Sequence, residues 1–335
     1  MKHYNIPVFI PHIGCPNDCV FCNQKKITGK GTDVSVEDVR NIIESYLETL
    51  PDKDREVEIA FFGGSFTGID FDMQTSFLEV AYQYIKSGQI DGIRLSTRPD
   101  YIDRKILDQL KKYRVTTIEL GVQSLAEKVL IASNRGHTAE DVYNAVKLIR
   151  EYDFSLGLQM MTGLPEDTDE TAIETAKKII SLSPDFVRIY PTLVLKDTKL
   201  EQMYLNGEYI PQEINSAVLL CKELLKMFNN ANINVIRISL QTTDEISPDG
   251  SLVAGPFNPQ FRELVESEIY FDTICDKIKN IKSKNIKIAV NSKEISKATG
   301  KNKSNINRIK NLYNIDLKIC GDSNLMPYDL KIIED

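Results

Sequence analysis

The chain has 335 residues, of which 42% are hydrophobic and 27% charged, and its formal net charge is −7. This balance is typical of a folded globular protein and excludes the disordered and collagen-like classes. No apolar run is long enough to span a bilayer, and the N-terminus lacks the apolar core of a signal peptide. We therefore expect a cytoplasmic protein that does not enter a membrane.

Short β-branched runs alternate with amphipathic segments over residues 1–240. The runs predict strands at Ile6–Pro11, Val57–Phe62, Gly92–Thr97, Thr116–Gly121, Ser155–Met161, Phe186–Pro191 and Val235–Leu240. The segments between them predict helices at Val36–Leu50, Met73–Lys86, Tyr101–Tyr113, Ala139–Glu151, Glu170–Ser181 and Gln212–Asn229. Strands that alternate with such helices form a parallel sheet, so the fold class is α/β. A closed or partly closed (β/α) barrel fits; a doubly wound sheet is the alternative, because periodicity does not decide closure.

The remaining residues predict a connection and a small second domain. Turn-forming residues dominate 241–257, and a helix is expected at Gln260–Ile278. The last part predicts a strand at 286–290, a helix at Ser292–Ala298, a loop at 300–303, a helix at Ser304–Tyr313 and a strand at Asp316–Cys320. We therefore expect a barrel over 1–240, a connecting loop and helix over 241–280, and a small α+β domain over 281–335.

The second domain is strongly basic. Between Lys277 and Lys318 there are twelve Lys and Arg residues against two acidic ones, a charge of +10, so the rest of the chain carries −17. Such a segment indicates an anionic partner. Helix, short basic loop with glycine, helix resembles the arrangement by which KH domains clamp a nucleic-acid backbone. We therefore expect Gly300, Lys301 and Lys303 to contact RNA, although Lys303 stands where KH domains have a second glycine. A solvated basic face and an unrelated helix-turn-helix are the alternatives.

Three cysteines, Cys15, Cys19 and Cys22, follow the first predicted strand with the spacing C-x3-C-x2-C. Three thiolates satisfy three irons of a [4Fe–4S] cluster and leave the fourth iron open, as catalysis at a metal requires. A closed zinc site completed by His12 is the alternative, but the second ligand pair of a zinc finger is absent. The other cysteines, Cys221, Cys275 and Cys320, are isolated and are expected to be small buried side chains.

The cysteine spacing, with Phe21 before the third cysteine, resembles the signature of the radical S-adenosylmethionine (SAM) superfamily. The run Phe61-Phe62-Gly63-Gly64-Ser65-Phe66 resembles the glycine motif of that superfamily. Five further segments follow in family order, at 94–100, 118–124, 134–138, 158–165 and 188–198. Together, over about residues 4–240, they resemble the radical SAM domain of the Elongator catalytic subunit, which modifies tRNA.

The resemblance implies a partial (β/α) barrel of radical SAM type and an enzyme that reductively cleaves SAM at a [4Fe–4S] cluster. The resulting 5′-deoxyadenosyl radical would modify RNA, in particular a tRNA base, with electrons from a reductant such as flavodoxin or ferredoxin. It also implies roles for individual residues. The SAM pocket would be formed by Gly63, Gly64, Ser96, Arg98, Glu119, Gln123, Arg135 and Gln159, with Arg135 on the SAM carboxylate. The substrate side would hold Tyr190 and Lys196.

Plainer interpretations remain open at these positions. Glu119 and Arg135 could form a structural ion pair, and Gln159 could satisfy backbone groups inside the barrel. The Elongator subunit continues into an acetyltransferase domain, which we do not expect after Asp335, so its acetyl donor is not assumed. Two other functions also remain open: a small-molecule radical SAM enzyme similar to oxygen-independent coproporphyrinogen oxidases, and a non-catalytic iron–sulfur protein that binds RNA.

Overall fold

The computed structural model describes residues 2–10, 15, 18–22, 34–51, 53–241, 243, 246–281 and 283–333. The chain divides into two compact units. The first comprises Met1–Gln212 and Met227–Pro256, and the second comprises Glu213–Lys226 and Phe257–Asp335. Within the described residues, no helix is both long and apolar enough to cross a membrane.

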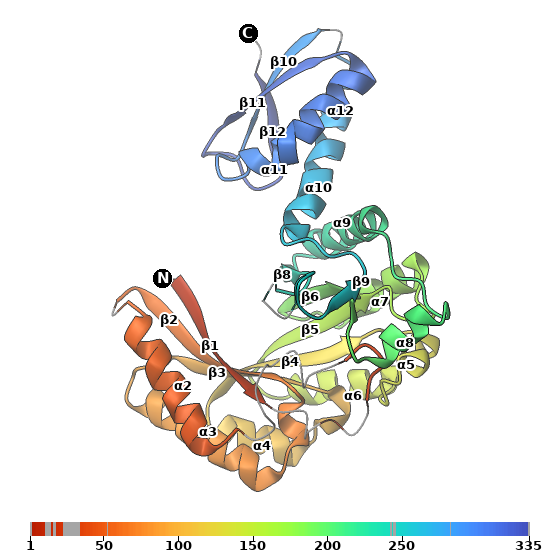
Figure 1. The fold of residues 1–335 in the computed structure, drawn as a ribbon. Helices are drawn as coiled ribbons and strands as arrows, with labels where there is room; N and C mark the ends of the chain where they lie inside the picture. Colours follow the sequence, from red (N-terminus) through yellow and green to blue (C-terminus); the bar gives the residue numbers. More distant parts are fainter. Residues whose placement is uncertain are drawn as a thin grey trace. The chain divides into compact units, whose positions relative to one another are not determined.

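The first unit is built on a parallel sheet of seven strands (Figure 1). These are β1 (Lys2–Ile10), β2 (Arg55–Gly63), β3 (Gly92–Thr97), β4 (Val115–Gln123), β5 (Ser155–Thr162), β6 (Phe186–Pro191) and β8 (Asn234–Ile238). They lie side by side in chain order, and each pairs in parallel with the next. A doubly wound sheet reverses its strand order at a switch point, so this order excludes that alternative. The sheet curls into a half-barrel, which confirms the expected partial (β/α) barrel.

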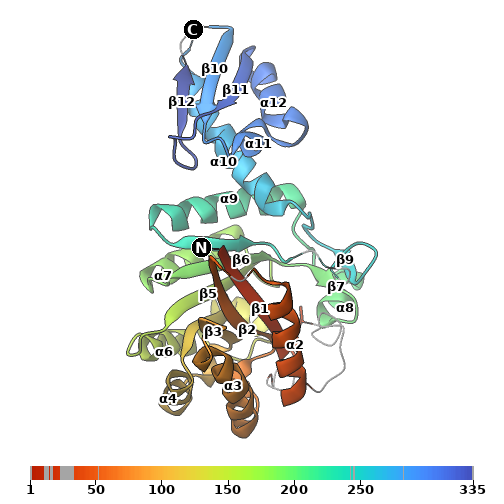
Figure 2. The same ribbon diagram turned by 90° about the vertical axis from the view of Figure 1, so that its left-hand side faces the viewer.

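Helices lie along the outer side of the curled sheet (Figure 2). They are α2 (Val36–Thr49), α3 (Phe71–Lys86), α4 (Arg104–Lys112), α6 (Ala139–Ile149) and α7 (Asp169–Ser181). Capping boxes fix the starts of several: Ser35 with Asp38 opens α2, and Thr138 with Asp141 opens α6. The helix predicted at Gln212–Asn229 is α9 (Ile214–Asn230), most of which belongs to the second unit. The sequence did not predict α5 (Glu127–Ala132), α8 (Lys199–Leu205) or the antiparallel pair β7 (Val194–Leu195) and β9 (Leu252–Ala254).

The two faces of the half-barrel differ in chemistry. Successive side chains of a strand point to opposite faces. On β2, Ile59 and Phe61 are fully buried beneath the outer helices, whereas Glu58, on the other face, forms an ion pair with Arg94 of β3. On the same inner face, β4 carries the charged side chain of Glu119 and β6 carries that of Arg188. The concave face is therefore a polar surface, unlike the aliphatic interior of an ordinary closed barrel.

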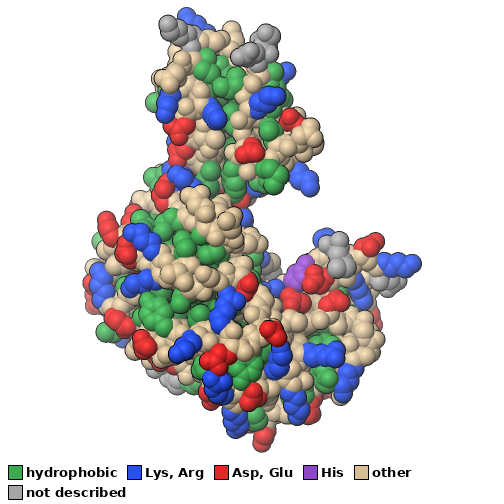
Figure 3. All heavy atoms as spheres, turned by 180° about the vertical axis from the view of Figure 1, so that it is seen from behind, with side chains coloured by type: hydrophobic (Ala, Val, Ile, Leu, Met, Phe, Trp, Pro, Cys, Tyr) green, Lys and Arg blue, Asp and Glu red, His purple; other side chains and the backbone are tan. Residues whose placement is uncertain are grey.

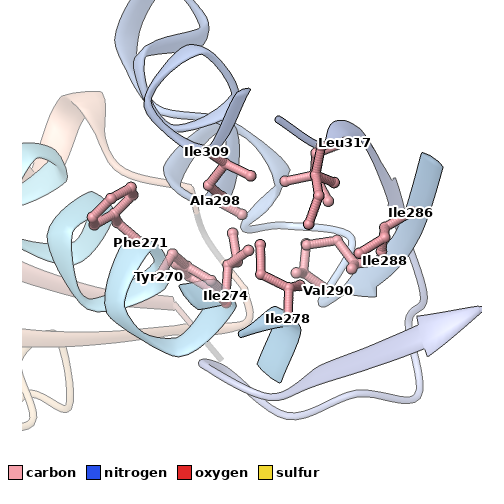
Figure 4. Packing of buried hydrophobic residues seen from close by; sticks show 11 residues of the cluster. Tyr270, Phe271, Ile274, Ile278, Ile286, Ile288, Val290, Ala298, Ile309 and Leu317 are labelled. Atoms are coloured by element: carbon pink, nitrogen blue, oxygen red, sulfur yellow. The ribbon is translucent and has the colours of Figure 1, made fainter. Parts of the chain in front are cut away.

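The second unit is a small α+β fold. Its elements are α10 (Phe261–Ile278), β10 (Asn285–Val290), α11 (Ile295–Thr299), η4 (Lys301–Lys303), α12 (Ser304–Tyr313), β11 (Asp316–Gly321) and β12 (Leu330–Ile333). Strand β10 lies in the centre, parallel to β11 and antiparallel to β12. Figure 4 shows Ile274 and Ile278 of α10 packed against the apolar side chains of β10, including Ile288. Helix α10, expected as part of a connection, thus supplies core residues to this unit.

Candidate active site

A cavity of about 250 Å³ lies where the carboxyl ends of the parallel strands meet. This edge of a parallel α/β sheet is where loops from successive strands converge, and it commonly carries the active site. The three cysteines of the C-x3-C-x2-C segment line this cavity, as do Gly63 at the end of β2 and Gly64 directly after it. The other predicted site residues that line it are Ser96, Arg98, Glu119, Gln123, Arg135, Gln159 and Tyr190.

Among the residues predicted for the SAM and substrate site, Lys196 does not line this cavity. Its side chain is exposed, and its Nζ donates a hydrogen bond of 2.7 Å to the carbonyl of Gly250. Its backbone N–H donates to the carbonyl of Ser251 at 2.8 Å. Lys196 therefore joins the end of β7 to the turn before β9, outside the cavity wall.

The cysteine segment is tied to the loop that follows α5. The backbone N–H of Val20 donates to the carbonyl of Ser133 at 3.1 Å, and the side-chain amide of Asn134 donates to the carbonyl of Asp18 at 2.9 Å. Next along that loop, Nη1 of Arg135 lies 3.5 Å from Sγ of Cys19. This attachment sets a buried guanidinium beside a buried thiol.

The Cys15 thiol lies in a mixed environment. Burial raises its pKa, while a hydrogen bond from the backbone of Ser65 and the positive charges of Arg135 and Arg98 act to lower it. No group of three or more His, Cys, Asp or Glu side chains in the described part of the chain is close enough to hold a metal ion. The thiols share a cavity wall without converging on one point, and His12 lies outside the described residues.

Two glycines allow a close approach of chain segments at this cavity. Gly63 has φ +101, and a Cβ there would lie 2.9 Å from the carbonyl oxygen of Ile10. A Cβ on Gly121 would lie 2.9 Å from Nη2 of Arg135, which donates to the Gly121 carbonyl. A larger residue at Gly121 would push the Arg135 guanidinium aside, and the positive φ and the nearby backbone favour glycine at Gly63.

One buried donor nitrogen of Arg135 has no hydrogen-bond partner among the described residues. Its Nη1 faces Cys19 and its Nη2 donates to Gly121, but its Nε is buried and has no partner among the described residues. A buried unpaired donor on a charged group is costly and calls for an acceptor. The positive charge and the unpaired Nε of Arg135 suit an anionic group in this cavity.

Arg98 is anchored rather than free to reach a ligand. Its Nε and Nη2 donate hydrogen bonds to the Asp100 carboxylate at 2.9 and 2.8 Å. Its Nη1 donates to the carbonyl of Arg135 at 2.7 Å. Its backbone N–H donates to Oγ of Ser65, which in turn contacts Oγ1 of Thr97 at 2.7 Å. Arg98 thus connects the ends of β2 and β3 to the Arg135 loop.

Glu119 does not form the ion pair with Arg135 that the sequence left open as a plainer interpretation. Its carboxylate pairs with Arg188 of β6 and Arg94 of β3, not with Arg135. Nε of Arg188 lies 2.5 Å from Oε2, and Nη2 of Arg94 lies 3.0 Å from Oε1. The suggested structural pair between Glu119 and Arg135 is therefore wrong. Nearby, the Gln159 amide nitrogen donates to Oε1 of Gln123 at 3.1 Å.

Arg94 and Arg188 were not predicted as site residues. Both occur in segments that resemble the family, and both also line a second cavity of about 560 Å³ near the amino ends of the strands. Glu119 lies between this cavity and the cysteine-lined one, bound by both guanidiniums. The sequence signal that could have identified these two arginines was a charged residue inside a strand that is otherwise rich in aliphatic residues.

The predicted RNA-binding loop lies in the second unit. Gly300, Lys301 and Lys303 line a cavity of about 390 Å³ together with the first turns of α10. Gly300 has φ +75, while Asn302 and Lys303 hold the left-handed conformation at φ 54 and 60. Lys301 and Lys303 are exposed, and Figure 3 shows basic side chains spread over this unit with apolar ones between them.

Comparisons with known proteins bear on the first unit above all. Residues 9–179 match the model of the Radical SAM superfamily, and residues 184–271 match the Radical SAM C-terminal domain. An uncharacterized protein of Methanocaldococcus jannaschii is 30% identical over 236 residues, which cover 67% of this chain and 72% of that protein. The tRNA uridine(34) acetyltransferase of the same organism is 30% identical over 192 residues, 51% of this chain but 36% of that protein.

Two solved structures share the fold. Elp3 of Methanocaldococcus infernus aligns over 84% of this chain and 64% of its own, with a TM-score of 0.64 at 22% identity. Coproporphyrinogen III oxidase of Escherichia coli, described as a radical SAM enzyme, aligns over 69% of this chain and 53% of its own, with a TM-score of 0.51 at 19% identity. The chain spans only about a third of the length of the acetyltransferase relative.

Proposed function

Because the chain belongs to the radical SAM superfamily, we propose that it is an enzyme that cleaves SAM at a [4Fe–4S] cluster and modifies an RNA base, in particular in tRNA. The observation that carries this proposal is the cavity in which Cys15, Cys19 and Cys22 share a wall with the glycine pair and Arg135. The tRNA substrate is supported by the names of relatives, among them a tRNA uridine(34) acetyltransferase.

The cysteines are suited to hold the cluster. Three thiolates leave one iron without a protein ligand, and the guanidiniums of Arg135 and Arg98 offset the negative charge that thiolates bring. When bound, the cluster and SAM supply the one-electron cleavage that yields methionine and a 5′-deoxyadenosyl radical. Electrons would come from a reductant such as flavodoxin or ferredoxin, in the cytoplasm.

The remaining cavity residues would bind and orient SAM. The unpaired Nε of Arg135 is suited to the SAM carboxylate, and the backbone at Gly63 and Gly64 to its amino group. Ser96, Glu119, Gln123 and Gln159 would form the wall around it. Arg98 would act by holding the Arg135 loop, since its own donors are already engaged.

Tyr190 would face the substrate, because it lines the cavity from β6. Lys196 would contribute outside the cavity, where an exposed ammonium can meet an RNA phosphate. Apolar side chains such as Leu193 and Leu195 also line the cavity and would help to exclude water around the reacting groups.

The second unit would bind RNA through Gly300, Lys301 and Lys303. The support is its order of elements: β10, α11, the basic loop, α12 and β11, with β10 and β11 parallel and adjacent. The loop presents two exposed lysines beside a cavity, and Gly300 lets the backbone turn there. This arrangement resembles a KH fold, so we propose a KH-like RNA-binding domain.

Nucleoside mass spectrometry tests this function. Total tRNA from a strain that lacks the gene should miss a nucleoside that wild-type protein restores and Cys19→Ala does not. The matched control is Cys320→Ala, which removes a half-buried thiol from the second unit and should restore the nucleoside. An unchanged nucleoside profile in the deletion strain would overturn the tRNA substrate and favour a small-molecule one.

A further inference from the structure

Arg188 contacts two residues that line the cysteine-lined cavity, although Arg188 does not line that cavity itself. Its Nε and Nη2 donate to the two carboxylate oxygens of Glu119 at 2.5 and 3.2 Å. Its Nη1 donates to the hydroxyl oxygen of Tyr190 at 3.3 Å. One guanidinium thus fixes a carboxylate and a phenol that both face the proposed reaction site.

The sheet register explains this arrangement. Arg188 and Tyr190 are two residues apart on β6 and so share the inner face, where their partners on β5 are Gln159 and Met161. Glu119 reaches Arg188 from β4, across the position of Gly157 on β5. Because Gly157 has no side chain, nothing separates the two charged groups.

The hydrogen bond to Tyr190 has a fixed direction. A guanidinium can only donate, so the Tyr190 oxygen must accept. The hydroxyl hydrogen of Tyr190 is then left to donate to another group. Because Tyr190 lines the cavity, that donor is available to an acceptor on a molecule bound there.

The guanidinium stays charged in this environment. Burial acts to lower the pKa of Arg188, but Tyr190 and the Glu119 carboxylate raise it, and the net shift is upward. The side chain of Arg188 is only 14% exposed. A charge-assisted hydrogen bond in such a site orients its acceptor more strongly than one in water.

We propose that Arg188 is a positioning residue that makes Tyr190 a hydrogen-bond donor to an acceptor oxygen or nitrogen on the substrate. The inference rests on the proposed function. It assigns Arg188 no contact with SAM or the cluster. Glu119 keeps its ion pair with Arg94 when Arg188 is replaced, so the effect should appear in the use of the radical on the substrate, and not in SAM binding.

Arg94 provides a matched comparison. It also binds Glu119, through Nε at 3.2 Å and Nη2 at 3.0 Å, and its side chain is 8% exposed. Its other ionic partner in the described part of the chain is Glu58, and its hydrogen bonds there do not include one to Tyr190. Arg94→Met therefore removes a buried arginine from the same carboxylate while it leaves the Tyr190 hydrogen bond intact.

The test uses the full chain, reconstituted with iron and sulfide under anaerobic conditions, and supplied with a reductant, SAM and total tRNA from the deletion strain. Modified nucleoside formed per 5′-deoxyadenosine is the main readout. Electron paramagnetic resonance of the reduced cluster, with and without SAM, is the second. Arg188→Met and Tyr190→Phe should each lower the ratio about three- to tenfold, as the loss of one hydrogen bond predicts.

The double variant should be no worse than Tyr190→Phe, because Arg188 acts through Tyr190. Arg94→Met should keep the wild-type ratio, and all variants should keep the SAM-induced spectral change. Additive effects of Arg188→Met and Tyr190→Phe, or equal ratios for Arg188→Met and Arg94→Met, would overturn the inference. If the wild-type protein forms no 5′-deoxyadenosine, that result contradicts the proposed function, and the inference, which rests on it, is then overturned as well.

Discussion

Gly157 on β5 lies directly against the ring of Phe186 on β6: a Cβ added to Gly157 would come within 2.3 Å of Cε2 of that ring. It would also lie 3.1 Å from Cγ of Glu119. The guanidinium of Arg94 lies over the same ring, 5.5 Å from its centroid. The absence of one side chain on β5 therefore lets an aromatic ring and a charged group meet on the inner face.

Gly157→Ala should consequently destabilise the first unit. The ring cannot yield easily because it packs beneath Arg94, and overpacking of this kind costs about 1–3 kcal/mol. Chemical unfolding followed by circular dichroism measures the change. Phe186→Leu in the same chain removes the atoms that clash and should restore part of the loss. A Gly157→Ala protein as stable as wild type would contradict the packing described.

Glu119→Ala should be more damaging than removal of a surface ion pair. The carboxylate is 5% exposed and neutralises parts of two buried guanidiniums, so its loss leaves Arg188 without a counter-charge. Removal of one partner from a buried ion pair costs about 3 kcal/mol or more. Lys177→Ala breaks the exposed pair with Glu174 and should hardly change the unfolding midpoint. Equal midpoints for the two variants would show that the Glu119 contacts carry no stability.

The strands were predictable because the outer face of the sheet is aliphatic. On β5, Leu156, Leu158 and Met160 alternate with smaller or polar residues, and the expected strand at 155–161 matches the observed one within a residue. Short elements such as α8 and the pair β7 and β9 were not predictable. They are too short to show a period, and tertiary contacts, such as Val194 packed near Leu200, hold them in place.

His137 should make stability depend on pH. Burial, and then the positive charges of Arg135 and Arg98, lower its pKa from 6.5 to about 3. Below pH 6.5 the unfolded chain binds a proton that the folded chain does not bind until about pH 3, so stability falls as the pH falls through this window.

Between pH 7.5 and 5.5, wild-type protein should therefore lose about 1.4 kcal/mol more unfolding free energy than His137→Gln, as the linkage relation gives for one such group. Urea titrations of both proteins at the two pH values measure this difference. The same loss in both proteins would mean that His137 is protonated in the folded state.

Lys301→Ala with Lys303→Ala should weaken RNA binding and reduce its salt dependence. Each lost phosphate contact lowers the slope of log affinity against log salt by about 0.7 for single strands, so two lower it by about 1.4. The control is Lys287→Ala with Lys318→Ala, neighbours on the exposed face of β10 and β11. Both double variants lose the same charge. Equal losses of affinity would show a diffuse basic surface in place of a loop site.

Lys303→Gly separates backbone geometry from charge at the same loop. Lys303 has φ 60, a conformation that costs a side-chain-bearing residue about 1 kcal/mol relative to glycine. The variant should raise the thermal stability of the second unit slightly while it weakens RNA binding in filter-binding assays. Tighter binding by the glycine variant would indicate that close backbone approach matters more than the lysine charge.

The candidate site was predictable in part. The cysteine spacing and the glycine pair pointed to a cavity at the strand ends, and Gly63, Gly64 and the three thiols do line one cavity. The Arg94–Glu119–Arg188 network was not predicted, because it depends on which side chains meet across neighbouring strands and across the gap at Gly157. Lys196 shows the opposite case, a residue in a family-like segment whose side chain lies outside the cavity.

The central claim is that this chain cleaves SAM to act on RNA, and the most direct measurement is 5′-deoxyadenosine formation by the reduced, anaerobically reconstituted protein. We predict formation that total tRNA from the deletion strain stimulates and that Cys19→Ala abolishes. A protein that binds iron and SAM but yields no 5′-deoxyadenosine, with or without that tRNA, would contradict the account.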